Sequence, residues 1–195
     1  MSEQRTVSRR SALTGVGAGG LGLALGSRLA GASAGAQTGS VADHPLIGIW
    51  MAMVTLPSAP DVAVAVPSIY SADGSVLLVF PVSQVGPNGV QLKSVSVGTW
   101  EAVDERRGHF TAVQSLTDVD GNYLGSMTID GYPAVSEDGQ TFEDQSPDAL
   151  ITIRDAANAI VATVEGGSPN PVLGIRMGAG NPGFPEIPGE ATPDR

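Results

Sequence analysis

The chain has 195 residues, no cysteine, and a formal net charge of −10 from 20 acidic and 10 basic side chains. Without cysteine it has no disulfide, thiolate metal site, c-type haem attachment or lipoprotein anchor on a cysteine. An acidic surface repels the phosphates of nucleic acids and anionic lipid headgroups, so we expect neither as a partner.

Residues 1–36 have the pattern of an export signal. Arg9 and Arg10 precede an uncharged, weakly apolar run over 11–27, and small residues follow at 32–36. A basic region, an apolar region and a small-residue cleavage site are the three parts of such a signal. The paired arginines resemble the twin-arginine subtype, which implies that the twin-arginine machinery exports this protein already folded.

The same segment is too short and too rich in Gly and Ala for a stable membrane anchor. Its apolar run ends at Arg28, whereas a spanning helix needs roughly 20 strongly apolar residues. We therefore predict cleavage after Ala34 or Ala36 and a periplasmic or extracellular location. Removal of residues 1–36 leaves 6 basic and 19 acidic side chains, a formal charge of −13.

Beyond the signal, the sequence predicts three segments. Residues 37–43 are small and mostly uncharged, and we expect them to form a flexible leader. Residues 179–195 have Pro or Gly at nearly every second position, which predicts a disordered tail. The folded domain is then 44–178.

Short runs rich in Val, Ile, Thr and aromatic residues alternate with tight turns throughout this domain. Four Asp-Gly pairs are turn signals, because both residues tolerate positive φ. No run has a sustained helical period. The predicted class is all-β, an antiparallel up-and-down meander closed into a barrel. The expected strands are 46–56, 62–71, 75–82, 91–103, 108–117, 122–135, 140–145, 149–154, 159–165 and 171–177.

Two of these strands, 46–56 and 75–82, are apolar on both faces. In the first, for example, Met51 and Met53 alternate with Trp50. A simple monomeric barrel turns alternate side chains to water. We therefore expect a homo-oligomer, or coverage of the outer face by the leader.

Gly48-Ile49-Trp50 opens the first strand, a second Gly-x-Trp ends at Trp100, and Arg176 lies on the last strand. These residues resemble the lipocalin-like, calycin-type barrels, which begin their first strand with Gly-x-Trp. The resemblance implies that Trp50 plugs one end of the barrel and that Arg176 stacks on it as a cation–π pair. Structural roles are expected for Gly48, Trp50, Trp100 and Arg176. The chain departs from the family in lacking a helix after the barrel and a disulfide.

Three functions remain open for such a domain. The first is a binding module that holds a small apolar ligand in its lumen. The second is an exported structural or interaction domain whose barrel is fully packed. The third is a cofactor-free barrel isomerase, cyclase or dehydratase that uses His109 or a buried carboxylate as base. For the first, the expected ligand-binding residues are Met51, Met53, Phe80, His109, Phe110, Tyr123 and Met127.

The sequence predicts no catalytic, metal or cofactor site. The two histidines, His44 and His109, form no His-x-His or His-Glu-x-x-His motif. Residues 118–122 begin like a calcium loop, but Ile129 occupies the position of the glutamate that would complete it. Gly-x-Ser-x-Gly is absent as well. We therefore name no catalytic residue and expect no cofactor.

Replacing Arg9 and Arg10 with Lys keeps both charges but removes the guanidinium groups that distinguish the twin-arginine subtype. We expect the Lys-Lys variant to accumulate as precursor in the cytoplasm while the unchanged protein is exported. Cell fractionation followed by immunoblotting measures the two pools. Export of the variant at the normal level would contradict the twin-arginine assignment.

Overall fold

A computed structural model gives the fold within the second of the chain's two units, Ala36–Arg195. It describes residues 41–56, 59–86, 89–167 and 171–184. The predicted signal, with Arg9 and Arg10, lies outside these described residues, and so do residues 37–40 and 185–195.

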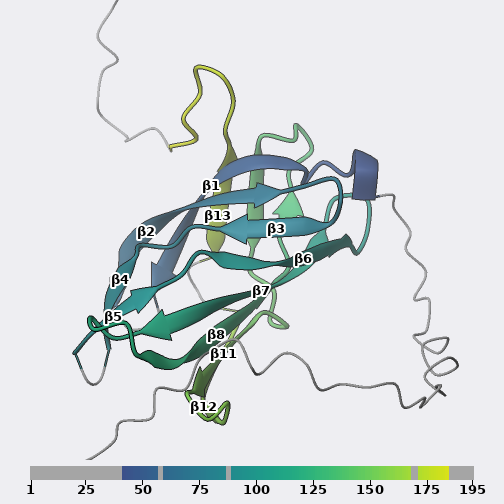
Figure 1. Cartoon of the computed structure of the whole chain (residues 1–195). Coiled ribbons are helices and arrows are strands. Elements are labelled where there is room, and N and C mark those ends of the chain that lie inside the picture. The colour runs from purple at the N-terminus through teal and green to yellow at the C-terminus, as the bar shows by residue number, and fades with distance from the viewer. Residues whose placement is uncertain (1–40, 57–58, 87–88, 168–170, 185–195) are drawn as a thin grey trace, which may run out of the picture. The chain divides into compact units, whose positions relative to one another are not determined.

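The described residues form one antiparallel β-sheet, preceded by a 3-10 turn, η1 (Val41–Asp43). Figure 1 shows β1, β2, β3, β6 and β7 side by side in the curled sheet. The strands are β1 (Gly48–Leu56), β2 (Ala59–Tyr70), β3 (Ser75–Leu78), β4 (Ser83–Gly86), β5 (Gly89–Lys93), β6 (Ser96–Ala102), β7 (Gly108–Thr117), β8 (Tyr123–Gly131), β9 (Ala134–Val135), β10 (Thr141–Asp144), β11 (Leu150–Asp155), β12 (Ile160–Glu165) and β13 (Val172–Arg176).

This architecture confirms the predicted all-β, antiparallel class, but it corrects the expected closure. The strand order is β12-β11-β8-β7-β6-β3-β2-β1-β13-β10-β9, and the two ends of this order, β12 and β9, do not pair with each other. β4 and β5 form a hairpin that branches off beside β7. The sheet is therefore a curled half-barrel rather than a closed barrel.

The ladder between β7 and β8 ends early because of a proline. Gly131 makes the last pair of β8, with Phe110 of β7. Pro133 follows, and without a backbone N–H it cannot continue the ladder. The N–H of Tyr132 is engaged by the Asp144 carboxylate at 2.7 Å. The predicted continuous strand 122–135 is therefore split into β8 and β9.

A short link spans the gap that this break leaves. β9 pairs with β10 and faces the start of β7 through one isolated bridge, between Arg107 and Ala134. Two backbone hydrogen bonds accompany the bridge, one accepted by the Pro133 carbonyl at 3.0 Å and one by the Arg106 carbonyl at 2.9 Å. So short a link ties β9 to β7 at one point and does not replace a full strand pair.

Most other predicted strands lie close to their expected bounds, and the exceptions have local causes. The predicted strand 91–103 divides into β5 and β6 around Ser94, whose hydroxyl accepts the N–H of Ser115 at 3.0 Å. The predicted strand 75–82 ends at Leu78, and the following segment turns into β4 instead. The hairpin of β4 and β5 therefore interrupts the meander between β3 and β6.

Alternate residues of the strands project onto the concave face and form the core. The largest core residues are aromatic and gather at one end of the sheet, which we call the aromatic end. Tyr70 lies at its centre. The Tyr70 ring packs edge-to-face on the rings of Trp100, Phe110 and Phe142, with ring centres 5.9–6.5 Å apart. Trp50 packs edge-to-face on Phe142 at 5.1 Å. Aromatic pairs of this kind contribute about 0.5–1.5 kcal/mol each beyond the area they bury.

Arg176 covers the aromatic end. Its guanidinium carbon lies 4.1 Å from the centre of the Trp50 ring, and Trp50 is fully buried. The guanidinium also donates hydrogen bonds to the carbonyls of Ile47, Pro45 and Gly139. The cation–π pair that the family resemblance implies is thus present, and it joins the segment before β1 to the β9–β10 turn.

Gly48 allows this contact. Its φ is +141°, and a Cβ at this position would lie 2.6 Å from Arg176 Nη1. A side chain would therefore both strain the backbone and displace the guanidinium. Trp50 is held in place by a hydrogen bond from its Nε1 to the Leu46 carbonyl at 2.8 Å. Trp100 is buried as well, and its Nε1 donates to a carbonyl of the β2–β3 turn at 2.9 Å.

After β13 the chain lies against the outer, convex face of β1. The N–H of Met177 donates to the Ile49 carbonyl at 2.8 Å, and a Cβ on Gly183 would lie 2.9 Å from that of Met51. Met51 is therefore buried although it points away from the core. Residues 177–184 cover this part of the convex face, whereas Ile49 remains exposed.

Arg176→Lys keeps the charge but cannot stack on Trp50 and reach three carbonyls together. We expect it to lower the free energy of unfolding by about 2–3 kcal/mol. Urea denaturation followed by tryptophan fluorescence measures the loss. The matched control is Arg154→Lys on β11, where the guanidinium donates to the Asn158 carbonyl, and its loss should stay below about 0.5 kcal/mol. Equal losses in the two variants would contradict the role given to Arg176.

Candidate functional site

Beside the aromatic end, the concave face has a second, more accessible part. Six apolar side chains pack against the core there but stay half-buried. They come from β1, β2, the segment after β3, β8, β11 and β13, so the curl of the sheet brings distant segments together on one face. We call them the concave floor: Val54, Val64, Phe80, Met127, Ile151 and Val172.

A buried polar pair lies next to the floor. Gln114 of β7 is buried on the concave face, where Ala112 and Leu116 are its neighbours in the alternation. The Ser96 hydroxyl donates to Gln114 Oε1 at 3.0 Å, and Gln114 Nε2 donates to the sulfur of Met127 at 3.4 Å. A thioether is a weak acceptor. The amide N–H is thus directed at the floor, where a ligand oxygen would be a better partner.

Three of the predicted ligand-binding residues lie on the concave face. Phe80 and Met127 belong to the floor. Phe110 is buried deeper, against Tyr70 in the aromatic end. The Nζ of Lys93 lies 5.5 Å from the centre of the Phe80 ring, which places a cation at the edge of the floor.

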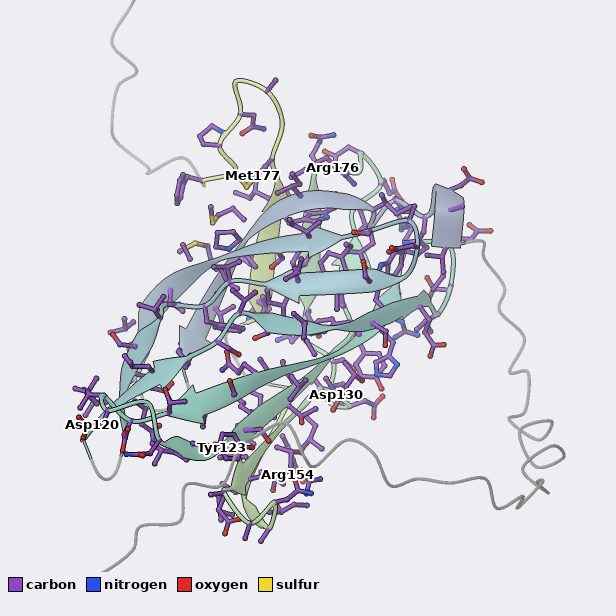
Figure 2. The ribbon with its side chains drawn as sticks, viewed as in Figure 1. Asp120, Tyr123, Asp130, Arg154, Arg176 and Met177 are labelled. Carbon is purple, nitrogen blue, oxygen red and sulfur yellow. The ribbon has the colours of Figure 1, made fainter. Side chains whose placement is uncertain are left out.

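The other four predicted residues are not on this floor. Met51 and Met53 alternate with Trp50 and so point to the convex face. His109 alternates with Phe110 and is also on the convex side. Tyr123 is exposed at the start of β8, and Figure 2 shows it at the end of the sheet opposite Arg176. The structure therefore does not bring the seven predicted residues together at one site.

His109 has a polar environment of its own on the convex face. Its ring stacks on that of Tyr132 at 4.4 Å, its Nδ1 lies 3.4 Å from a Glu101 oxygen, and its Nε2 lies 3.8 Å from an Asp130 oxygen. The Thr111 hydroxyl donates to the same Asp130 carboxylate. A protonated His109 would pair with both carboxylates. The geometry contains no hydrogen bond from a hydroxyl to the imidazole, so it does not form a nucleophile–base pair.

Asp144 is the buried carboxylate nearest the core. Burial raises its pKa, and its oxygens accept the N–H groups of Tyr132 and Ser146 at 2.7 and 3.2 Å. Burial also raises the pKa of Tyr70, with Asp144 adding to the shift. A carboxyl with a raised pKa is a candidate general acid or base. Here, however, the two backbone donors tie it to the segment after β8 and to the loop after β10, which gives it a structural role.

His44 is buried where the chain enters β1. Its Nδ1 accepts the Leu46 N–H at 3.1 Å, so its Nε2 carries the proton and donates to the Asp104 carbonyl at 3.0 Å. Its ring also packs on Trp100, with the ring centres 5.5 Å apart. Burial lowers the pKa of His44. The imidazole is thus held neutral by a donor and an acceptor at once.

The acidic run at 118–122 forms a turn. Asp118 accepts hydrogen bonds from the Asn122 side-chain amide at 2.8 Å and from the backbone N–H groups of Asn122 and Asp120 at 2.8 and 3.0 Å, and these bonds lower its pKa. Nowhere in the described part of the chain do three or more His, Asp or Glu side chains group in a way that fits a metal ion. The described residues also include no helix long and apolar enough to cross a membrane.

Comparison of the chain with protein-family models, with curated proteins and with solved structures returned no match. No known relative therefore assigns a role to the concave floor or to its polar pair.

Sequence reasoning missed Gln114 and Ser96. A signal for Gln114 was present, because it interrupts the apolar series Phe110, Ala112 and Leu116 on one face of a strand. A polar residue on a buried face needs a hydrogen-bonding partner. No sequence feature identifies Ser96 as that partner, because the pairing depends on the register between β6 and β7.

The neutral state of His44 predicts a pH-dependent stability. In the unfolded chain this imidazole takes up a proton below about pH 6.5, whereas the folded protein resists protonation because its pKa is lowered. The free energy of unfolding should therefore fall as the pH drops below about 6.5, by at most about 1.4 kcal/mol per pH unit. Urea titrations at several pH values between 5 and 8 measure this slope.

His44→Gln, which does not titrate, should make the dependence shallower, and Val161→Gln, an exposed substitution that removes no titratable group, is the control. An unchanged slope in His44→Gln, or a slope of opposite sign in the unchanged protein, would overturn the assignment of His44 as a buried neutral imidazole.

Proposed function

We propose that this protein binds a small, largely apolar molecule on the concave floor of its half-barrel. The observation that supports the proposal is the set of six half-buried apolar side chains on one concave face, next to a buried amide. A face of this kind is what small-molecule sites use: apolar walls with a few placed polar groups.

The amide of Gln114 specifies the chemistry of the ligand. Its Nε2 is a donor whose acceptor is the weak sulfur of Met127. A ligand carbonyl, carboxylate or ether oxygen would replace that sulfur with a stronger acceptor, while the rest of the ligand covers apolar side chains. Covering about 100 Å² of apolar surface contributes about 2.5 kcal/mol. The proposed ligand class is therefore a lipid-like or aromatic molecule with one oxygen acceptor.

The alternative functions remain, and each rests on a different observation. A packed structural or interaction domain is favoured by the aromatic end, where the concave face is filled by side chains. A cofactor-free isomerase, cyclase or dehydratase would need a base on the floor. Asp144, whose pKa is raised, has both oxygens engaged by backbone N–H groups. We therefore rank ligand binding first.

The proposed setting is outside the cytoplasm, after export through the twin-arginine machinery. Its support is the sequence of residues 1–36 and the absence of cysteine, since a disulfide-free domain is able to fold before export. The calycin-type resemblance is likewise a proposal. It is supported by the stack of Arg176 on Trp50 and by Gly48 at the start of β1.

Met127→Gln tests the floor directly, because it places a polar amide where the proposed ligand needs an apolar surface. We expect the dissociation constant of a fluorescent fatty-acid analogue to rise about 10-fold, which corresponds to a loss of about 1.4 kcal/mol. Met53→Gln is the matched control: it is also half-buried, but it lies on the convex face of β1. Its dissociation constant should be unchanged, as should that of His109→Ala.

Gln114→Met keeps the volume of the side chain but removes the amide. It should weaken the fatty-acid analogue, which carries oxygen acceptors, and leave a probe without oxygen unaffected. If no probe binds at micromolar concentration, or if Met53→Gln weakens binding as much as Met127→Gln, the binding proposal fails. The packed structural domain then becomes the better account.

A further inference from the structure

The convex face carries an apolar row that none of the described segments covers. Ile49, Ile69, Leu77, Val97 and Val113 are direct partners in the pairing of β1, β2, β3, β6 and β7. They form one straight line across five neighbouring strands, and each of them is 37–53% exposed. We call this line the convex row.

Two further side chains widen the row. Val79 follows Leu77 by two residues and Val95 precedes Val97 by two, and both are exposed to a similar extent. The cross-strand partners Ser75, Thr99 and Thr111 lie on the opposite side of the row and are polar. An apolar centre with a polar border is the anatomy of a protein–protein interface.

From this surface we infer that the convex row is the contact between two copies of this chain. Its dimensions fit such a contact. Five strands at about 4.8 Å and two rows of side chains give an apolar area of roughly 300 Å², and one further row of side chains on either side enlarges it to roughly 650 Å² per copy. The total of about 1,300 Å² lies at the lower end of the range for specific interfaces.

Charge also favours a second copy. The chain has a formal charge of −10, so two copies repel each other wherever their carboxylates meet. The convex row and its two additional valines contain no charged side chain. Like copies are therefore able to place the centre of this surface in contact without opposing carboxylates there, because Glu101 and Asp130 lie beyond its polar border of Thr99 and Thr111.

Once the predicted signal, residues 1–36, is removed, the terminal segments that flank the described fold lack the side chains to cover the row. Residues 37–40 are Gln-Thr-Gly-Ser, and residues 185–195 contain three acidic residues and a single large apolar one, Ile187. One isoleucine cannot shield seven exposed aliphatic side chains from water. A second copy brings a matching set of seven, which pack face to face as two sheets do.

Because the sheet is curled, two convex faces meet first at their central strands. Leu77 of β3 occupies that centre and Val97 of β6 lies directly beside it, so both should matter strongly. We expect sedimentation velocity of the mature protein, residues 37–195, to show a concentration-dependent dimer. Val97→Lys and Leu77→Lys, which place a charge in the contact, should each raise its dissociation constant at least about 100-fold. Circular dichroism checks that these variants keep the β-sheet.

Val161→Lys is the matched control, because Val161 is equally exposed but lies on the edge strand β12. It should dimerise as the unchanged protein does. The absence of cysteine from the chain allows a second test: Val97→Cys should form a covalent dimer on mild oxidation, and Val161→Cys should not.

Three results would overturn the inference. The first is a monomer at all concentrations. The second is a dimer that Val161→Lys dissociates and Val97→Lys does not, which would move the contact to the free edge of β12. The third is a protein that dimerises only after deletion of residues 185–195, which would show that the tail covers the row.

Discussion

The stack of Arg176 on Trp50 is the interaction on which the arrangement of the concave face depends. The guanidinium joins the last strand to the segment before the first strand and to the β9–β10 turn, all in one contact. Trp50 in turn packs on Phe142, and the ring of Tyr70 connects that pair to Phe110. A single cation therefore ties the two ends of the chain's described fold to the aromatic end of the concave face.

The second constraint is the break at Pro133. An eight-residue ladder joins β7 to β8, but it stops where proline provides no N–H and Asp144 engages the N–H before it. The remaining strands curl without completing a ring. The concave floor lies within this curl. On the opposite, convex face of five strands, the same curl leaves the aliphatic side chains of the convex row exposed. The proposed ligand site and the proposed dimer contact thus lie on the two faces of one bent sheet. The apolar side chains of the concave face would contact the ligand, and those of the convex face would contact the second copy.

The sequence was sufficient to predict the class of fold and several strands, because Val- and Ile-rich runs between Asp-Gly turns rarely form anything other than antiparallel β-strands. Gly48, Trp50 and Arg176 were identified through a family pattern, and the structure places them in contact. The sequence could not show which face of β1 is concave, because this strand is apolar on both faces and the alternation of its side chains does not distinguish them. His109 and Phe110 illustrate the result: they are adjacent in the chain but lie on opposite faces. Gln114 was overlooked because its partner, Ser96, is set by strand register.

The link between Arg107 and Ala134 makes the curvature of the half-barrel compliant. Two backbone hydrogen bonds hold β9 to the start of β7 and contribute about 1–3 kcal/mol together, in addition to the packing of the buried Pro133 and Val135. A closed barrel would have to break a whole strand pair to change its diameter. Here one isolated bridge joins the described residues of β9 to the start of β7, so the curvature of the sheet can change at this point without the loss of a whole strand pair.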